Sequence, residues 1–330
     1  MSIPYAPRTL ISPSAHVHLE YDPTDVPPIP STSADGEPCH WTRFVCVSDT
    51  HARTFPVPPG DVLLHSGDLT NTGKVEEFGR TMEWLCGLPH PVKIVIAGNH
   101  DLTLHEGWYE QNYSRWGNVM HPRSAVMELL KGPKAVKAGV VYLQDEAHEF
   151  SLGNGRRTWS IYGSPWSPEF FNWAFNYKRG EEATKLVSKF PKTDILLTHG
   201  PIAGIFDCTR MGDLAGCDDL RARIRDLRPR LHLAGHIHEA HGGHIHTWKE
   251  GGGEGLPSVQ NTSADEDVET EDVEAASGLD RSQDKETTVF VNAANWPSGS
   301  KAWRTKEGGG EAKVPFAGPG FQPVIVDLRD

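Results

Sequence analysis

VKIVIAGNHD, at residues 92–101, is the stretch of this chain that says most about its fold. It begins as a run of apolar, mostly β-branched residues and ends abruptly in Gly, Asn, His and Asp. Two similar runs precede it, since RFVCVS at 43–48 stops at Asp49 and DVLLH at 61–65 stops shortly before Asp68. Short continuous apolar runs indicate strands buried on both faces. Each of these three strands is therefore followed by polar side chains at its carboxyl end.

The segment between the second and third runs, KVEEFGRTMEWLCGL, has its apolar residues at helical spacing. Val75, Phe78, Met82 and Leu85 fall on one face of a helix. Strand, helix and strand with polar residues after each strand is the open α/β pattern. In such sheets ligands bind at the carboxyl ends of the strands.

The second half of the chain repeats this organisation. DILLTHG at 194–200 and LHLAGHIH at 231–238 are apolar runs that end in His, and a helix over roughly 215–227 joins them. Further strands, expected in a second sheet, are 139–143, 158–164, 287–294 and 323–328. These elements predict a four-layer α/β/β/α sandwich of two mixed sheets flanked by helices.

Composition divides the 330 residues into three parts. Residues 1–40 are rich in Pro and Ser and are expected to form an extended N-terminal arm, packed on the surface or partly disordered. Residues 41–330 are expected to form one large domain. Within it, about 250–286 is an acidic segment without an aromatic residue, which predicts a disordered insertion. The alternative for this segment is a regulatory or partner-binding role.

Charge and cysteine content exclude several classes of protein. The net charge is −12 and no basic block is present, which argues against binding to a nucleic-acid backbone. Five scattered cysteines without CxxC spacing indicate reduced thiols and a cytoplasmic location. The N-terminus lacks the apolar region of a signal peptide, and no apolar run approaches the roughly 20 residues that span a bilayer. A homodimer is left open.

Five short motifs follow the predicted strands: DTH at 49–51, GD at 67–68, GNHD at 98–101, THG at 198–200 and GHIH at 235–238. Each alone occurs often by chance, but all five in order at strand ends are hard to explain without a shared site. Their carboxylate, amide and imidazole donors suit Mn, Fe or Zn, because no Cys is among them.

This order of motifs resembles the calcineurin-like metallophosphoesterase superfamily. The pieces VCVSDTH, GDVLLHSGDLTNTG, KIVIAGNHD, DILLTHGPIAG and LHLAGHIHEA are similar to its MPPED (metallophosphoesterase-domain) branch, which in turn resembles class III cyclic nucleotide phosphodiesterases. The resemblance covers roughly residues 41–249 and 287–297.

The resemblance implies a centre of two divalent metal ions, with Mn²⁺ expected first and Fe, Zn or Co as alternatives. It assigns the first ion to Asp49, His51 and His238, and the second to Asn99, His199 and His236, with Asp68 bridging both.

Substrate roles follow for the neighbouring residues. His100 would face the phosphate beside Asn99 and protonate the leaving group, and Asp101 would orient it; a helix N-cap is the alternative for Asp101. His241 is the later histidine expected nearest the substrate, with a surface or supporting role as the alternative. The aromatic stretch 162–176 is either a base-stacking wall or ordinary packing.

We therefore expect hydrolysis of a small phosphodiester, such as a 2′,3′- or 3′,5′-cyclic nucleotide, by a metal-bridging hydroxide. Alternatives are a phosphomonoesterase or nucleotidase, a hydrolase of a specialised-metabolite phosphate, and a low-turnover scaffold of the same fold.

Overall fold

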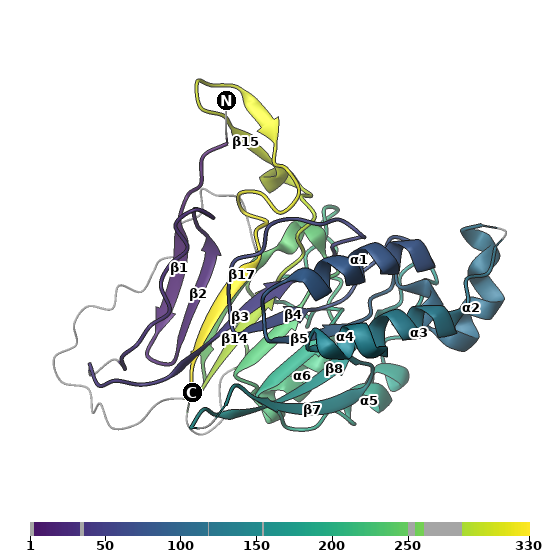
Figure 1. The fold of residues 1–330 in the computed structure, drawn as a ribbon, viewed down its shortest axis with the longest axis horizontal. Coiled ribbons are helices and arrows are strands. Elements are labelled where there is room, and N and C mark those ends of the chain that lie inside the picture. Colours follow the sequence, from purple (N-terminus) through teal and green to yellow (C-terminus); the bar gives the residue numbers. More distant parts are fainter. Residues whose placement is uncertain (1–2, 34–35, 118, 154, 250–254, 261–285) are drawn as a thin grey trace.

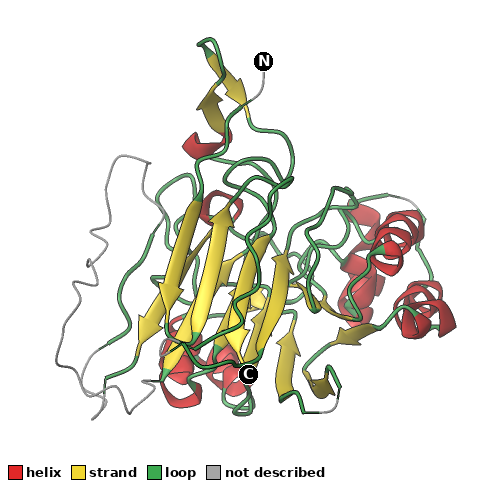
Figure 2. Ribbon diagram, turned by 60° about the vertical axis from the view of Figure 1, so that its left-hand side comes forward, coloured by secondary structure: helices red, strands yellow, loops and turns green. Residues whose placement is uncertain are grey.

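The computed structural model describes residues 3–33, 36–117, 119–153, 155–249, 255–260 and 286–330. Two large sheets lie face to face with helices outside them (Figures 1 and 2). This is the four-layer α/β/β/α arrangement that the sequence predicts.

The first sheet has seven strands, with the motif-bearing strands side by side in its parallel part. Its order is β1 (Arg8–Ser12), β2 (Ala15–Glu20), β17 (Val324–Arg329), β3 (Trp41–Val47), β4 (Val62–His65), β5 (Val92–Ile96) and β6 (Val140–Leu143). The strands from β3 to β6 pair in parallel, and β17, β2 and β1 extend the sheet by antiparallel pairs.

The second sheet has six strands with a parallel centre and antiparallel edges. Its order is β13 (Gly242–Thr247), β14 (Thr287–Asn292), β12 (Leu231–Ala234), β11 (Ile195–Thr198), β8 (Thr158–Ser164) and β7 (Glu146–Ser151). Only β13 and β7, at the two edges, run antiparallel to their neighbours.

The helices cover the outer faces of the two sheets. Three lie over the first sheet, α1 (Val75–Gly87), α3 (Arg123–Lys131) and α4 (Pro133–Lys137), and two lie over the second, α5 (Glu181–Val187) and α6 (Asp218–Leu227) (Figure 1). The remaining short elements are α2 (Glu106–Asn112), η1 (Leu102–Leu104), η2 (Tyr113–Arg115), η3 (His238–Ala240), η4 (Ser300–Ala302), and the strand pairs β9 (Ser167–Pro168) with β10 (Asn176–Tyr177) and β15 (Trp303–Thr305) with β16 (Glu311–Lys313).

Strand β3 shows why apolar runs form the middle layers. Phe44 and Cys46 face the core between the sheets, while Val45 and Val47 face the core under the helices. Successive side chains of a strand point to opposite faces, so a strand covered on both sides must be apolar throughout.

Two strands lie in a different sheet from the one expected. The runs at 139–143 and 323–328 were expected in the second sheet, but they form β6 and β17 of the first. An apolar run shows that a strand is buried, but it does not show which neighbouring strand it pairs with.

The expected N-terminal arm also contains regular structure. Residues 8–20 form the hairpin β1–β2, which extends the first sheet beyond β17 (Figure 1). Within it His18 is buried, and its Nε2 lies 3.5 Å from Asp327 Oδ2. The alternation of His and apolar residues in this strand does not look like a buried run, which is why sequence periodicity missed it.

A buried ion pair ties β3 to β17. Arg43 Nε and Nη2 donate to Asp327 Oδ1 and Oδ2, both at 2.7 Å, and both side chains are almost wholly buried. Arg43→Met would leave the carboxylate buried without its partner, so we expect the free energy of unfolding to fall by about 3–5 kcal/mol. Urea unfolding measures this. The double variant Arg43→Met/Asp327→Leu should recover most of the loss, and a single variant as stable as the parent would contradict the prediction.

The greater part of the acidic segment, residues 250–254 and 261–285, lies outside the described residues. Residues 255–260 are packed: Val259 N donates to Gly204 O at 2.7 Å, and Arg221 donates to the carbonyl of the buried Leu256. Gln260 donates to the Asp207 carboxylate. These six residues therefore form part of the folded body.

This packing gives a prediction with its own control. Replacement of residues 261–285 by a short Gly-Ser linker should leave the melting temperature close to that of the parent, because loop-closure entropy changes slowly with length. Turnover of the phosphoester expected from the sequence should stay within a few-fold. Replacement that extends back to Gly255 should lower the melting temperature, since it removes the contacts of Leu256 and Gln260. Turnover and thermal unfolding of the two variants test this. Equal stability of both would show that residues 255–260 contribute nothing.

Candidate metal centre

The motif residues meet because the strands before them end at the same edge. Parallel pairing aligns Val47 with His65 and His65 with Val95, so the loops after β3, β4 and β5 lie together. The loop after β11 joins them from the second sheet, where His199 Nδ1 lies 2.9 Å from Ser66 O.

The backbone at this edge is held in an unusual conformation. Asp49, His51, Asp68 and His236 all have φ between 47° and 69°, the left-handed region. Non-glycine residues there cost of order 1–3 kcal/mol each and cluster at functional sites. Gly98 is required for a different reason, because a Cβ at this position would collide with Asp68 Oδ1 and the Asp68 amide.

One group of donors lies on the β3 side of the site. Asp49, His51, Asp68 and His238 each offer a ligand atom, and these atoms lie within 4.8 Å of one another. His238 Nε2 is 3.2 Å from Asp49 Oδ1 and 3.3 Å from His51 Nε2, and His51 Nε2 is 3.7 Å from Asp68 Oδ2. Four hard or borderline donors so close together fit a divalent cation.

A second group lies on the other side of Asp68. His199 Nε2 is 2.9 Å from Asn99 Oδ1 and 3.4 Å from Asp68 Oδ1, and the rings of His199 and His236 are 5.0 Å apart. Asp68 therefore turns one carboxylate oxygen toward each group.

The hydrogen bonds of His199 test whether this second group fits a metal. The carbonyl of Ser66 can only accept, so Nδ1 carries a hydrogen, and Nε2 is the ring atom turned toward Asn99 Oδ1 and Asp68 Oδ1. With Nε2 unprotonated, its lone pair and these two oxygens converge as three donors, and such a set fits a divalent metal.

The protonation of the histidines also fits metal binding. Burial lowers the pKa of His51 to about 4 and that of His236 to about 3, although nearby carboxylates oppose the shift. For Asp49, burial alone would raise the pKa, but the hydrogen bond from His238 and the neighbouring rings hold it well below its usual value. The neutral rings of His51 and His236 and the charged carboxylate of Asp49 are in the ligand state that metals require. For His238, burial alone would lower the pKa, but the hydrogen bond and charge of Asp49 raise it, so a metal bound there would displace a proton.

His100 lies beside the cluster without joining either group. Its Nδ1 donates to Asn71 O at 2.7 Å, its amide donates to Asp68 Oδ1 at 2.8 Å, and its ring packs 4.2 Å from that of Trp173. The ring centroid of His51 is 4.7 Å away. With Nδ1 occupied by a carbonyl, Nε2 is the ring atom left for exchange of a proton.

The Asp101 carboxylate holds the loop together. It accepts hydrogen bonds from the amides of Gly98, Leu69 and Thr70 and from Thr70 Oγ1, at 2.7–3.1 Å. Burial and Asp68 raise its pKa to about 7, although these hydrogen bonds oppose the rise. It makes no side-chain cap to the following 3₁₀ helix η1, and its hydrogen bonds tie the loop of Asp68 to that of Asn99.

His241 is buried, and its Nε2 lies 2.8 Å from Gln322 O. Burial lowers its pKa to about 4. This contact joins the start of β13 to the loop before β17, which is a supporting position within the fold.

Aromatic residues border the cluster on two sides. On one side lie Trp173 and Phe170, both from the aromatic stretch 162–176. The ring of Trp173 packs against that of His100, and the ring of Phe170 is 6.3 Å from that of His236. On the other side Trp296 lies 5.3 Å from the ring of His51, and the guanidinium of Arg53 lies 4.7 Å from Trp296. No motif in the sequence marked Trp296 or Arg53, although Trp296 follows an apolar strand just as the metal-site motifs do.

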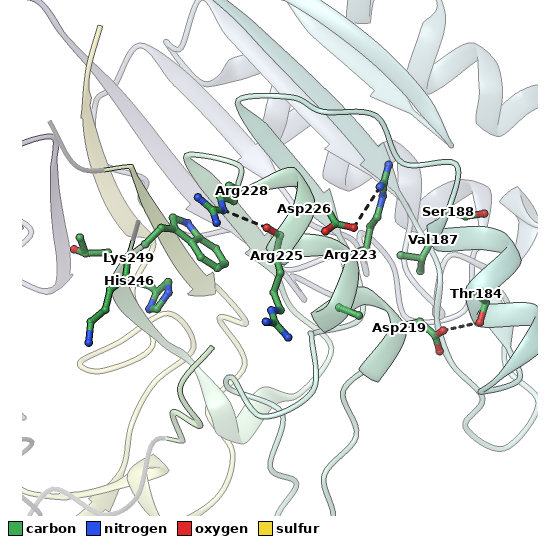
Figure 3. A pocket seen from close by; sticks show the side chains of 13 residues that line it. Thr184, Val187, Ser188, Asp219, Arg223, Arg225, Asp226, Arg228, His246 and Lys249 are labelled. Atoms are coloured by element: carbon green, nitrogen blue, oxygen red, sulfur yellow. Dashed lines mark hydrogen bonds and ion pairs between the residues drawn. The ribbon is translucent and has the colours of Figure 1, made fainter. Parts of the chain in front are cut away.

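A separate groove of about 620 Å³ lies between α5, α6 and the end of β13, and none of the clustered residues lines it (Figure 3). Several of its charged side chains have partners within the chain. Arg223 lies 3.7 Å from Asp226, Thr184 donates to Asp219 at 2.6 Å, and Arg228 pairs with Glu286 at 2.8 Å.

Two sheets whose strand ends bring together Asp, Asn and His side chains define a metal-dependent hydrolase fold. The chain belongs to the calcineurin-like phosphoesterase family, whose model matches residues 42–240. Within the described residues, no helix has both the length and the apolar character needed to cross a membrane.

Two relatives and one solved structure show what the chain is similar to. It is 39% identical over 226 residues to metallophosphoesterase domain-containing protein 1 of Homo sapiens, and the match covers 66% of this chain and 66% of that protein. It is 34% identical over 213 residues to UPF0046 protein T07D4.2 of Caenorhabditis elegans, and this match covers 61% of this chain and 52% of the relative. It thus spans about two thirds of the first and half of the second. The crystal structure of TT1561 of Thermus thermophilus aligns with 63% of this chain and 85% of its own, at 14% identity and a TM-score of 0.38.

Proposed function

We propose that the protein hydrolyses small phosphodiesters, with 2′,3′- and 3′,5′-cyclic nucleotides as the expected substrates, at a centre of two divalent metal ions. The observation that carries the proposal is the orientation of Asp68, whose Oδ2 faces His51 and whose Oδ1 faces His199. A carboxylate with one oxygen toward each of two donor groups is the geometry of a bridging ligand.

The remaining ligands follow from the two groups. Asp49, His51 and His238 would hold the first ion, and Asn99, His199 and His236 the second. Two bound ions would supply Lewis-acid stabilisation of the phosphate and a water of lowered pKa. Mn²⁺ is the ion we expect, because the donors are oxygen and nitrogen without thiolate.

The chain itself supplies orientation and a proton. Asn71 O fixes the ring of His100, so that Nε2 can protonate the departing oxygen of the diester. Asp101 is a positioning residue, since it holds the loops of Asp68 and Asn99 in register. The ring of His100 takes its orientation from Asn71 O, whereas the Asp101 carboxylate is engaged by backbone amides of its own and the neighbouring loop.

Several broader assignments remain part of this proposal. The catalytic domain is placed at residues 41–330, with β1 and β2 extending its first sheet. A cytoplasmic location is supported by the five cysteines, which are all free thiols. We place His241 in a supporting role, because its side chain is buried and its Nε2 lies 2.8 Å from Gln322 O.

The competing functions are a phosphomonoesterase and a low-turnover scaffold of the same fold. The experiment that separates them is turnover with added Mn²⁺ of bis(p-nitrophenyl) phosphate, cyclic nucleotides and the corresponding monophosphates, with metal content measured in parallel. We expect two metal ions per chain and faster hydrolysis of diesters. Faster hydrolysis of monoesters would favour the phosphomonoesterase, and bound metal without turnover would favour the scaffold.

A further inference from the structure

A cavity of about 670 Å³ opens beside the metal centre. Trp296 lines it, and the ring of Trp296 also lies 5.3 Å from that of His51 and 6.0 Å from that of His238. Glu239, which follows His238 in the chain, lines it as well. The cavity therefore adjoins the metal centre.

The charged side chains of this cavity are mostly cationic. Arg210, Lys301 and Lys313 line it, against the single carboxylate of Glu239. Among the described residues, none of these three cationic side chains has a hydrogen-bond or ion-pair partner. The neighbouring Arg304 differs, because it donates to both oxygens of Glu20 at 2.7 and 2.9 Å.

Lys301 is the most unusual of the three. Its side chain is half-buried, and the two cations that act on it most strongly are Arg8 and Arg304. Burial first, and then these two cations, lower the pKa of its ammonium to about 7. A charge withdrawn from water without a partner is unfavourable, and an anion in the cavity would compensate it.

The groove beside α6 makes the contrast clear. That groove also contains several arginines, but Arg223 there lies 3.7 Å from Asp226 (Figure 3), and Arg228 pairs with Glu286. Unmatched positive charge therefore occurs in the cavity next to the metal centre.

We propose that this cavity binds a second phosphate group of the substrate through Lys301, with Arg210 and Lys313 at its rim. The inference rests on the proposed phosphodiesterase function and specifies its substrate class. The preferred substrate is a diester whose organic substituent carries a further phosphate, and Trp296 lies between the reacting phosphate and this second one. A 2′,3′-cyclic nucleotide with a 5′-phosphate has this chemistry.

The test compares 2′,3′-cyclic AMP with its 5′-phosphorylated form at saturating Mn²⁺. The readout is the ratio of kcat/KM for the two substrates, which a general loss of stability would not change. We expect the parent to favour the phosphorylated substrate, and Lys301→Met to lower the ratio about 10- to 100-fold, the usual effect of losing a hydrogen bond to a charged group. Lys301→Arg should restore much of it. Lys137→Met, an exposed lysine on α4, is the matched control and should keep the parental ratio.

The outcomes distinguish a missing second phosphate site from a missing diesterase activity. A parent that hydrolyses both substrates equally, or a Lys301→Met variant with the parental ratio, overturns the second phosphate site and leaves the diesterase standing. If neither substrate is hydrolysed, calorimetry with adenosine 3′,5′-bisphosphate and adenosine 3′-phosphate decides the site separately. Tighter binding of the bisphosphate that Lys301→Met abolishes would support it, and equal binding would overturn it.

Discussion

Asp68→Asn should abolish phosphodiester turnover, with a fall of more than about 10³-fold. Asp68 turns Oδ2 toward His51 and Oδ1 toward His199, so it is the one carboxylate shared by both donor groups. A neutral amide cannot balance two cations, and the stabilisation of several kcal/mol that metals give to a phosphoryl transition state would be lost. Metal occupancy should fall as well. Turnover and elemental analysis measure the two effects.

The fold should survive this substitution, since Asn tolerates the left-handed conformation that Asp68 adopts at φ 54°. Circular dichroism of the variant checks this. The matched control is Asp145→Asn, because Asp145 has the same φ of 54° but lies outside the donor groups. It should keep its metals and most of its activity. Full turnover in a folded Asp68→Asn protein would disprove the bridging assignment.

His100→Ala should lower turnover by about 10²–10⁴-fold, the usual contribution of a positioned general acid. The variant should keep both metals and still bind the diester, because the ring is fixed by Asn71 O and Trp173 and is not among the proposed ligands. Asn99→Ala should behave differently and weaken the second metal, since Asn99 Oδ1 lies 2.9 Å from His199 Nε2. Steady-state kinetics with metal analysis separate the two residues.

A comparison of two leaving groups shows which role His100 has in hydrolysis. The loss in His100→Ala should shrink with p-nitrophenolate, which needs little protonation, and grow with an alkoxide such as a ribose oxygen. An equal loss on both substrates would mean that His100 mainly stabilises charge on the phosphoryl group, and a loss of metal would mean that its role is wrongly assigned. His148→Ala, on the edge strand β7, is the control and should leave both activities unchanged.

Much of the site could be predicted because its signals are local. An apolar run such as VKIVIA must be buried, and a glycine followed by Asn, His and Asp at its end marks a strand terminus with polar groups. Parallel strands bring such termini to one edge, so five separate motifs predict one cluster. In the structure, one ligand atom from each of Asp49, His51, Asp68 and His238 lies within 4.8 Å of the others.

Local sequence therefore specifies the fold class, the strand ends and the kinds of donor at them, because each depends on a few neighbouring residues. The packed fold decides that β6 and β17 join the first sheet, and that Nε2 of the buried His241 contacts Gln322 O. It also brings Trp296 near His51 and places Lys301 unpaired in the adjoining cavity. These contacts join residues far apart in the chain, and their geometry is set by packing between two sheets, which no local pattern of residues records.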